Sequence, residues 1–397
     1  MANTLKFGNG EWYGKKDTIL AYNDENSNYK PLLFDFSRAS KATRVNKDGL
    51  IEEVGSGQPR VDYLNNTKGA LKLEPSRTNL VTYSNGFTDS SWLPTGATVV
   101  SGVISPDGTS NAFTLSNTAS SGIIQKAVSL TGLRVVSIFA KKGTHRYLRI
   151  GAYGGTNSYA NFDLENGVVA DGANANIEDY GNGWFRCICH SADGATGGVQ
   201  IFPSNNTTGA ATTNGSIQIY GVQLEEGSYA TSYIPTSGSA VTRLSETCSQ
   251  TVPDGVIGQT EGVLYAELGS IPSEAIDDVF IELSDGTSNN RILFYADSNS
   301  YIRNQIKASG SISSLINTNV TVSSNMKIAI TYKSNEAKVF INGVQYGGTD
   351  TSVVVPSVNK MNLENYTGAR SQTSTLKDVK LYNTVLTDQE LIALTQV

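Results

Sequence analysis

Residues 181–190 read Gly-Asn-Gly-Trp-Phe-Arg-Cys-Ile-Cys-His, a turn followed by a strand. The Gly-Asn-Gly part favours a tight turn, because glycine and asparagine tolerate positive φ. Side chains alternate between the two faces of a strand. One face of this strand would therefore carry Phe185, Cys187 and Cys189, and the other Trp184, Arg186 and Ile188. This alternation predicts a strand, and we interpret Trp184 as a core residue.

Similar short runs, each bounded by turn residues, recur along the chain. Residues 161–164 and 168–169 flank Glu165-Asn166-Gly167, which predicts a hairpin because Asn-Gly turns match the twist of paired strands. Residues 217–220 form a further alternating run. Regularly spaced short strands of this kind are typical of β-sandwiches and jelly rolls.

The composition agrees with an all-β protein. Of 397 residues, 39% are hydrophobic, only 17% are charged, and 39 are glycine. This balance fits short strands joined by many turns. It argues against a helical bundle, which would be richer in Glu, Lys, Leu and Ala.

The charge and the apolar runs exclude two classes of partner. The formal net charge is −6, whereas a nucleic-acid-binding domain is normally basic. No apolar run approaches the roughly 20 residues that a membrane-spanning helix needs, and residues 1–17 contain no secretory signal. We therefore expect no nucleic acid, no membrane insertion and synthesis in a cytoplasm. Three cysteines are too few for a disulfide framework, so buried thiols are expected.

The chain divides into four predicted parts. We expect an irregular N-terminal segment over residues 1–75, a β-sandwich over 76–246, a linker over 247–258 and a second β-sandwich over 259–397. The first segment has too few apolar residues for a core of its own, so we expect it to pack on another domain or on neighbouring chains, the latter in a homotrimer. The sequence Thr387-Asp388-Gln389-Glu390 is a capping box and predicts one short C-terminal helix.

Several sequence blocks together resemble a known group of proteins. The N-terminal blocks resemble the opening of bacteriophage tail and fibre proteins: residues 36–40 (Phe-Ser-Arg-Ala-Ser), 48–51 (Asp-Gly-Leu-Ile), 59–63 (Pro-Arg-Val-Asp-Tyr) and 73–80 (Leu-Glu-Pro-Ser-Arg-Thr-Asn-Leu). The continuation resembles their carbohydrate-binding-module-like jelly roll, through Tyr83-Ser84, Trp92 and residues 181–186, 221–227 and 231–236. The resemblance covers roughly residues 34–245.

The last part of the chain resembles a concanavalin A-like (laminin-G-like) sandwich. The residues that carry this resemblance are Asn342-Gly343 and residues 376–382 (Leu-Lys-Asp-Val-Lys-Leu-Tyr), which lead into residues 386–391.

Together the two resemblances imply a virion protein, a fibre or adhesin subunit located in a tail or capsid fibre and assembled in the host cytoplasm. The N-terminal segment would contact other virion proteins, and the sandwiches would meet host-surface polysaccharide. Two alternatives stay open: a head-fibre or capsid decoration protein without a receptor role, and a polysaccharide depolymerase.

The sequence predicts no enzyme. Glycoside hydrolysis needs two suitably spaced carboxylates. Glucanases of the concanavalin A-like fold carry Glu-x-Asp-x-x-Glu on one strand, and no Glu-x-Asp occurs in this chain. Glu225-Glu226 and Asp277-Asp278 are adjacent pairs that would point in opposite directions on a strand. His145 and His190 lack a Gly-x-Ser-x-Gly nucleophile elbow.

Two groups of aromatic residues are candidates for glycan contact. Tyr153 and Tyr159 flank the predicted loop Gly154-Gly155-Thr156-Asn157-Ser158, and Tyr295, Tyr301 and Arg303 surround residues 297–300. The alternative for each group is a structural tyrosine or a contact between subunits. No cofactor is predicted. Calcium at Asp285 or Asp297 is the one ion considered, because related sandwiches hold it in loops, although no dense run of Asp and Asn ligands is present.

Overall fold

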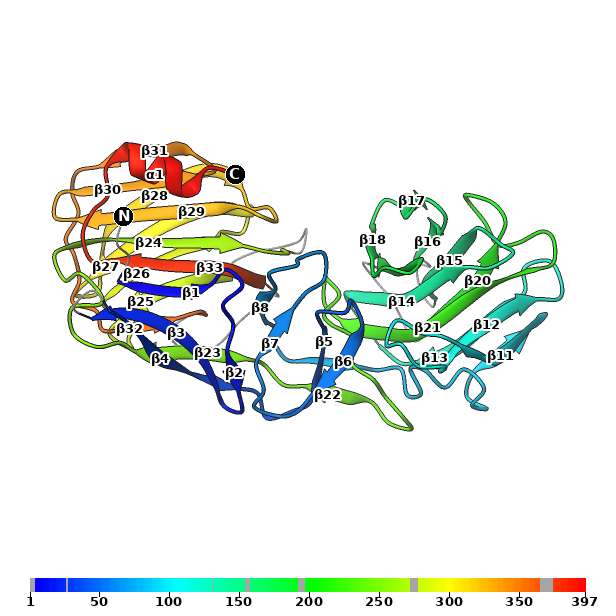
Figure 1. The fold of residues 1–397 in the computed structure, drawn as a ribbon. Helices are drawn as coiled ribbons and strands as arrows, with labels where there is room; N and C mark the ends of the chain where they lie inside the picture. The colour runs from blue at the N-terminus through cyan, green and yellow to red at the C-terminus, as the bar shows by residue number, and fades with distance from the viewer. Residues whose placement is uncertain are drawn as a thin grey trace. The chain divides into compact units, whose positions relative to one another are not determined.

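The structure is a computed structural model that describes residues 4–25, 28–130, 132–153, 158–191, 197–271, 278–364 and 374–397. These residues form strands and turns and a single short helix near the C-terminus (Figure 1). The chain folds into two compact units. Unit 1 comprises Met1–Lys41, Val54–Ser76 and Leu244–Val397, and unit 2 comprises Ala42–Glu53 and Arg77–Arg243. The predicted all-β fold with sandwich-like sheets is confirmed.

Unit 2 is built mainly from two six-stranded sheets. The first contains, in spatial order, β10 (Leu93–Thr95), β13 (Ile123–Val128), β20 (Gly197–Ser204), β15 (Tyr147–Tyr153), β16 (Ser158–Asp163) and β17 (Val168–Asp171). The second contains β11 (Ala97–Val103), β12 (Ala112–Asn117), β21 (Gly215–Glu226), β14 (Arg134–Lys142), β19 (Trp184–Ser191) and β18 (Ala175–Asp179). Two short pairs complete it: β9 (Arg77–Asn79) with β22 (Val241–Arg243), and β5 (Ala42–Val45) with β6 (Ile51–Val54).

The core of unit 2 lies between its two six-stranded sheets. Ile150 and Ile201 of the first sheet share one apolar cluster with Ile138 and Cys187 of the second. Trp184 is buried, as predicted. The hairpin at Asn166-Gly167 is also confirmed, because β16 and β17 pair antiparallel and Gly167 has a φ of 66°.

Unit 1 is one continuous 17-stranded sheet. From β31, successive pairings run through β30, β29, β24, β33, β1, β3, β4, β23, β32, β25, β26 and β27 to β28. In chain order these strands are β1 (Leu5–Gly8), β3 (Thr18–Glu25), β4 (Asn28–Ser37), β23 (Thr247–Thr251), β24 (Glu261–Leu268), β25 (Asp278–Ser284), β26 (Arg291–Ala296), β27 (Tyr301–Ala308), β28 (Ser311–Thr321), β29 (Lys327–Lys333), β30 (Glu336–Ile341), β31 (Val344–Asp350), β32 (Lys360–Asn362) and β33 (Ser374–Tyr382). The three short strands are β2 (Gly14–Lys15) beside β3, β8 (Ala70–Leu73) beside β33 and β7 (Arg60–Asp62) beside β8.

The sheet of unit 1 folds back on itself around one apolar core. Leu264 and Ile330, on β24 and β29, lie in the same cluster as Ile292 and Ile302, on β26 and β27. On the other side of β24 and β29, a second cluster receives Leu391 of helix α1 (Asp388–Thr395). The predicted capping box at the start of this helix is present, with Thr387 and Glu390 bonding to each other's backbone N–H groups.

The N-terminal segment and the expected linker differ from the sequence-based boundaries. β1, β3 and β4 belong to the sheet of unit 1, and Phe34 and Phe36 lie in its core. β23, within the expected linker 247–258, pairs with both β4 and β32. Residues 1–75 therefore find their apolar partners largely within the chain. This removes the argument for a trimer that was based on missing partners.

Two further expectations concern cysteine and membranes. Cys187, Cys189 and Cys248 are free and buried, as predicted. No helix among the described residues combines the length and the apolar character needed to cross a membrane.

Candidate functional site

The first sheet of unit 2 presents polar and aromatic side chains on the face opposite its core. Its inward residues include Ile124, Leu148, Ile150, Ala160 and Ile201. Side chains alternate along each strand, so the residues next to these point outward. On that outward face lie Gln125 on β13, Gln200 and Phe202 on β20, Arg149 on β15 and Tyr159 on β16. We call these five residues the Tyr159 face.

Hydrogen bonds connect the strands across the Tyr159 face. The Tyr159 hydroxyl donates to Oε1 of Gln200, and Nε2 of Gln200 donates to Oε1 of Gln125 at 2.7 Å. On the middle strand, β15, Gly151 is paired with Tyr159 of β16 on one side and with Gln200 of β20 on the other. Because Gly151 has no side chain, the Tyr159–Gln200 bond can pass over β15. This row of groups is thus held in place before any ligand arrives.

The Tyr159 hydroxyl stays protonated at neutral pH. Burial raises the pKa of this phenol above its ordinary value; Arg149 opposes the shift and Tyr153 adds to it. The ordinary value is already about 10. Tyr159 is therefore a hydrogen-bond donor under physiological conditions.

Arg149 completes the surface. Its Cζ lies 4.5 Å from the centroid of the Tyr159 ring, a cation–π contact. Its Nη1 donates to Oδ1 of Asn161 at 3.0 Å and to the carbonyl of Thr208 at 3.1 Å. Within the described residues, its Nε and Nη2 donate no hydrogen bond. Arg149 thus keeps donors available beside an aromatic ring.

This arrangement suits a ligand with both apolar and hydroxyl surfaces. The Phe202 ring meets the Tyr159 ring nearly edge-on, with centroids 6.0 Å apart and an interplanar angle of 73°. All five side chains of the Tyr159 face are half-buried, so they are fixed and yet reachable. Sugar rings present C–H groups that pack on aromatic side chains, and hydroxyls that need convergent donors and acceptors.

The structure places both predicted tyrosines of unit 2 on strands. Tyr153 ends β15 and Tyr159 lies within β16, so both are strand residues rather than loop residues. Residues 154–157 of the expected loop lie outside the described residues. Sequence reasoning missed the partners of Tyr159. Alternation places Arg149 on the other face of the strand from Leu148 and Ile150. No local sequence feature indicates that β15 lies between β16 and β20.

The second predicted group does come together, in unit 1. Tyr295 on β26 is paired in register with Arg303 on β27, and Cζ of Arg303 lies 5.9 Å from the centroid of the Tyr301 ring. Nε of Arg303 donates to Oδ2 of Asp297 at 2.6 Å. Oδ1 of Asp297 accepts from the backbone N–H groups of Asn299 and Tyr301 at 2.9 and 3.0 Å. Arg303 and Asp297 thus stabilise the β26–β27 turn.

The two aspartates considered for calcium also act within turns. Oδ1 of Asp285 accepts from the backbone N–H of Thr287 at 2.8 Å, and its Oδ2 accepts from Nδ2 of Asn290 at 2.8 Å. Asp297 is paired with a guanidinium, which would repel a cation. Among the described residues, no group of three or more His, Cys, Asp or Glu side chains could hold a metal ion. Neither aspartate fits a calcium site.

Comparison with known protein families identifies part of unit 1. Residues 270–392 match the family described as the concanavalin A-like lectin/glucanases superfamily. This match agrees with the concanavalin A-like (laminin-G-like) resemblance found in the last part of the sequence. None of the curated proteins matches the chain.

Several solved structures show distant likeness. The carbohydrate-binding module CBM40 of the Ruminococcus gnavus IT-sialidase, bound to α2,3 sialyllactose, is 16% identical, with 35% of this chain and 84% of that chain covered and a TM-score of 0.30. Domain 4 of AbnA, an arabinanase from Geobacillus stearothermophilus, is 17% identical, with 43% and 83% covered and a TM-score of 0.29. The Trypanosoma rangeli sialidase is 10% identical, with 96% and 82% covered and a TM-score of 0.31. Likeness at this level does not extend the ligands of those proteins to this chain.

Proposed function

We propose that this protein is a non-catalytic carbohydrate-binding protein and that the Tyr159 face contacts the glycan. The observation that carries the proposal is the hydrogen-bonded row Gln125–Gln200–Tyr159 with Arg149 against the tyrosine ring. It combines apolar ring surface with fixed donors and acceptors. The lectin/glucanase family match of residues 270–392 supports a carbohydrate-related role for the chain as a whole.

The biological setting that we propose is adhesion by a phage fibre subunit. Support comes from the sequence blocks in residues 34–80, which resemble the opening of phage tail and fibre proteins. An open sheet face binds each sugar weakly, so several copies on one particle would supply the avidity. The number of subunits stays a prediction. Sedimentation analysis of the full-length protein tests it, with a trimer expected and a monomer arguing against the fibre assignment.

The first experiment tests the Tyr159 face. Affinity electrophoresis of the full-length protein in gels containing dextran, mannan, galactan or lipopolysaccharide should show retardation by at least one polymer. Tyr159→Ala should weaken this binding by about tenfold, because an aromatic contact and a hydrogen bond are lost together. Tyr159→Phe should fall in between, because it keeps the ring.

The matched control is Tyr13→Ala, since Tyr13 is 60% exposed and lies in unit 1. Tyr13→Ala should bind as the unaltered protein does. The assignment fails if Tyr159→Ala binds as tightly as Tyr13→Ala, or if none of the four polymers retards the protein.

The second experiment tests the absence of catalysis. Prolonged incubation with a polysaccharide that binds should release no new reducing ends. The basis is that the chain contains no Glu-x-Asp sequence of the glucanase type. Reducing ends that disappear when a single Glu or Asp is replaced would overturn the non-enzymatic part of the proposal.

A further inference from the structure

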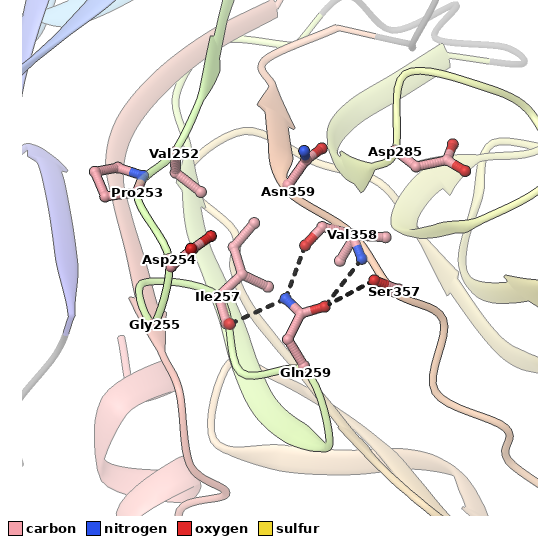
Figure 2. Close-up of a pocket in the computed structure, with 10 residues that line it drawn as sticks. All are labelled: Val252, Pro253, Asp254, Gly255, Ile257, Gln259, Asp285, Ser357, Val358 and Asn359. Atoms are coloured by element: carbon pink, nitrogen blue, oxygen red, sulfur yellow. Dashed lines mark hydrogen bonds between the residues drawn. The ribbon is translucent and has the colours of Figure 1, made fainter.

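Unit 1 contains a pocket of about 460 Å³. Residues 252–259, which connect β23 to β24, form one wall; residues 357–359, just before β32, form another; and Asp285, just after β25, completes the lining (Figure 2). Pockets that hold small ligands commonly measure about 300–1,000 Å³. The volume is therefore sufficient for a sugar residue.

The walls of the pocket are rigidly connected. Figure 2 shows the Gln259 side chain bonded to both walls: its Nε2 donates to the carbonyls of Ile257 and Val358 at 3.2 and 2.8 Å, and its Oε1 accepts from the Ser357 hydroxyl at 3.2 Å. The backbone N–H of Val252 donates to the carbonyl of Asn359 at 2.9 Å. The pocket is thus preorganised, which lowers the entropic cost of binding.

Two polar side chains of the lining remain available. The carboxylate of Asp254 and the amide of Asn359 are exposed, and neither forms a side-chain hydrogen bond within the described structure. The apolar part of the lining comes from Val252, Ile257 and Val358, all buried. The pocket therefore offers unused donors and acceptors beside an apolar floor.

The charge of the pocket selects against anions. None of its ten lining residues is Lys or Arg, whereas Asp254 and Asp285 are both acidic. Burial acts to raise the pKa of Asp285, but hydrogen bonds from Thr287 and Asn290 outweigh this effect and hold it below its ordinary value. Asp285 therefore stays ionised at neutral pH; its carboxylate points away from Asp254 and Asn359 (Figure 2), so it adds negative charge near the pocket without contacting the ligand.

We propose that this pocket is a second, independent carbohydrate site that takes a terminal neutral sugar and rejects sugar acids. Asp254 accepts hydrogen bonds from sugar hydroxyls, Asn359 both donates and accepts, and the floor of Val252 and Val358 meets the C–H groups. The site is a pocket between two loops of unit 1, whereas the Tyr159 face is the outer surface of a sheet. It does not require the Tyr159 face to be correct.

Saturation-transfer NMR and titration of the full-length protein test this site. The probes are D-glucose, D-galactose and D-mannose, with D-glucuronate and D-galacturonate as acidic counterparts of the first two. At least one of the three neutral sugars should bind. Any acidic counterpart should bind at least about tenfold more weakly than its neutral sugar, because of like-charge repulsion.

Variants then locate the binding. Combined Asp254→Ala and Asn359→Ala should raise the Kd of the neutral sugar about tenfold or more, as expected for the loss of two hydrogen bonds. Asp254→Asn alone keeps the shape of the side chain and should specifically reduce the discrimination against the acidic sugars. Asp48→Ala removes an exposed carboxylate of unit 2 and serves as the matched control, with no expected effect.

The outcomes separate this proposal from the proposed function. Tyr159→Ala should leave binding of the neutral monosaccharide unchanged, even where it abolishes retardation by polysaccharide. The second site is overturned if no neutral sugar binds, if the double variant binds as the Asp48→Ala control does, or if an acidic sugar binds as well as its neutral counterpart.

Discussion

Glu282 is a single residue whose environment changes its ionisation. Its side chain, on β25, is fully buried, and the nearest cation is Nη1 of Arg291, 3.8 Å from its Oε2. Among the residues that the structure describes, that oxygen has no hydrogen-bond partner. Burial raises the pKa of Glu282 to about 7, although Arg291, Ser284 and Asn362 act to lower it. At acidic pH the folded protein therefore keeps this carboxyl protonated.

This raised pKa predicts how the stability of unit 1 depends on pH. Below pH 4.5, which is the ordinary pKa of a glutamate, Glu282 is protonated in both the folded and the unfolded chain. Its ionisation then does not change the free energy of unfolding. Between pH 4.5 and about 7 only the unfolded chain releases the proton, so stability falls as pH rises, by on the order of 3 kcal/mol. Amide hydrogen exchange of β24 and β25 at pH 5 and 7.5, corrected for intrinsic rates, measures this change.

The comparison for Glu282 is Glu282→Gln, which cannot titrate. The free energy of unfolding of this variant, measured by hydrogen exchange, should depend less on pH than that of the unaltered protein. At pH 7.5 the variant should be the more stable of the two. An identical pH dependence in the two proteins would show that Glu282 is not the titrating group.

At the level of elements, a buried ionic network joins the ends of four strands in unit 1. Arg38 follows β4, Arg60 begins β7, Glu74 follows β8 and Glu246 precedes β23. Arg38 Nη1 and Glu246 Oε1 are 2.7 Å apart, Arg60 Nη2 and Glu74 Oε2 are 2.8 Å apart, and Arg60 also pairs with Glu246. Burial acts to lower the pKa of Arg60, but the two carboxylates outweigh it and raise the pKa.

Glu246→Gln should therefore destabilise unit 1 severely. It would remove the negative charge that pairs with both Arg38 and Arg60, and breaking a buried pair costs about 3–5 kcal/mol. The control is Glu11→Gln, at a surface pair with Lys6 in which Glu11 is 54% exposed. Such a pair contributes at most about 1 kcal/mol. Hydrogen exchange of β4 and β23 compares the two, and similar small effects would argue against a structural role for the network.

At the level of the whole molecule, the chain leaves unit 1 and returns to it. Unit 1 takes its strands from residues 1–41, 54–76 and 244–397, and unit 2 takes the two segments between them, 42–53 and 77–243. The main apolar cluster of unit 2 lies within residues 81–224. The core of unit 1 needs Leu5, Phe34 and Phe36 as well as residues beyond 248.

This organisation predicts opposite behaviour for two fragments. Residues 77–243 should fold alone and unfold cooperatively, because they contain the whole main apolar cluster of unit 2 and lack only the short pair β5–β6. Residues 259–397, the expected second sandwich, should not, because β33 would lose β1, and β32 would lose β23. Thermal unfolding followed by circular dichroism tests both. A cooperative transition in 259–397 would mean that the N-terminal strands are dispensable for this fold.

The sequence alone determined the local features of this protein. Alternation in residues 184–190 and the Asn-Gly turn at 166–167 predicted a strand and a hairpin, both present, because each depends on neighbouring residues only. The capping box at Thr387 is local for the same reason.

Tertiary structure decided which of these elements lie side by side. Arg38 and Glu246 are 208 residues apart in sequence, and Tyr159 and Gln200 are 41 apart. Alternation fixes which face a side chain occupies, but it does not identify the neighbouring strand. That choice depends on long-range pairing and on how the whole core is filled, so the sequence does not show that β1, β3 and β4 join the sheet formed by residues 247–397. For the same reason the partners of Tyr159, and with them the candidate site, emerged only when the sheets were assembled.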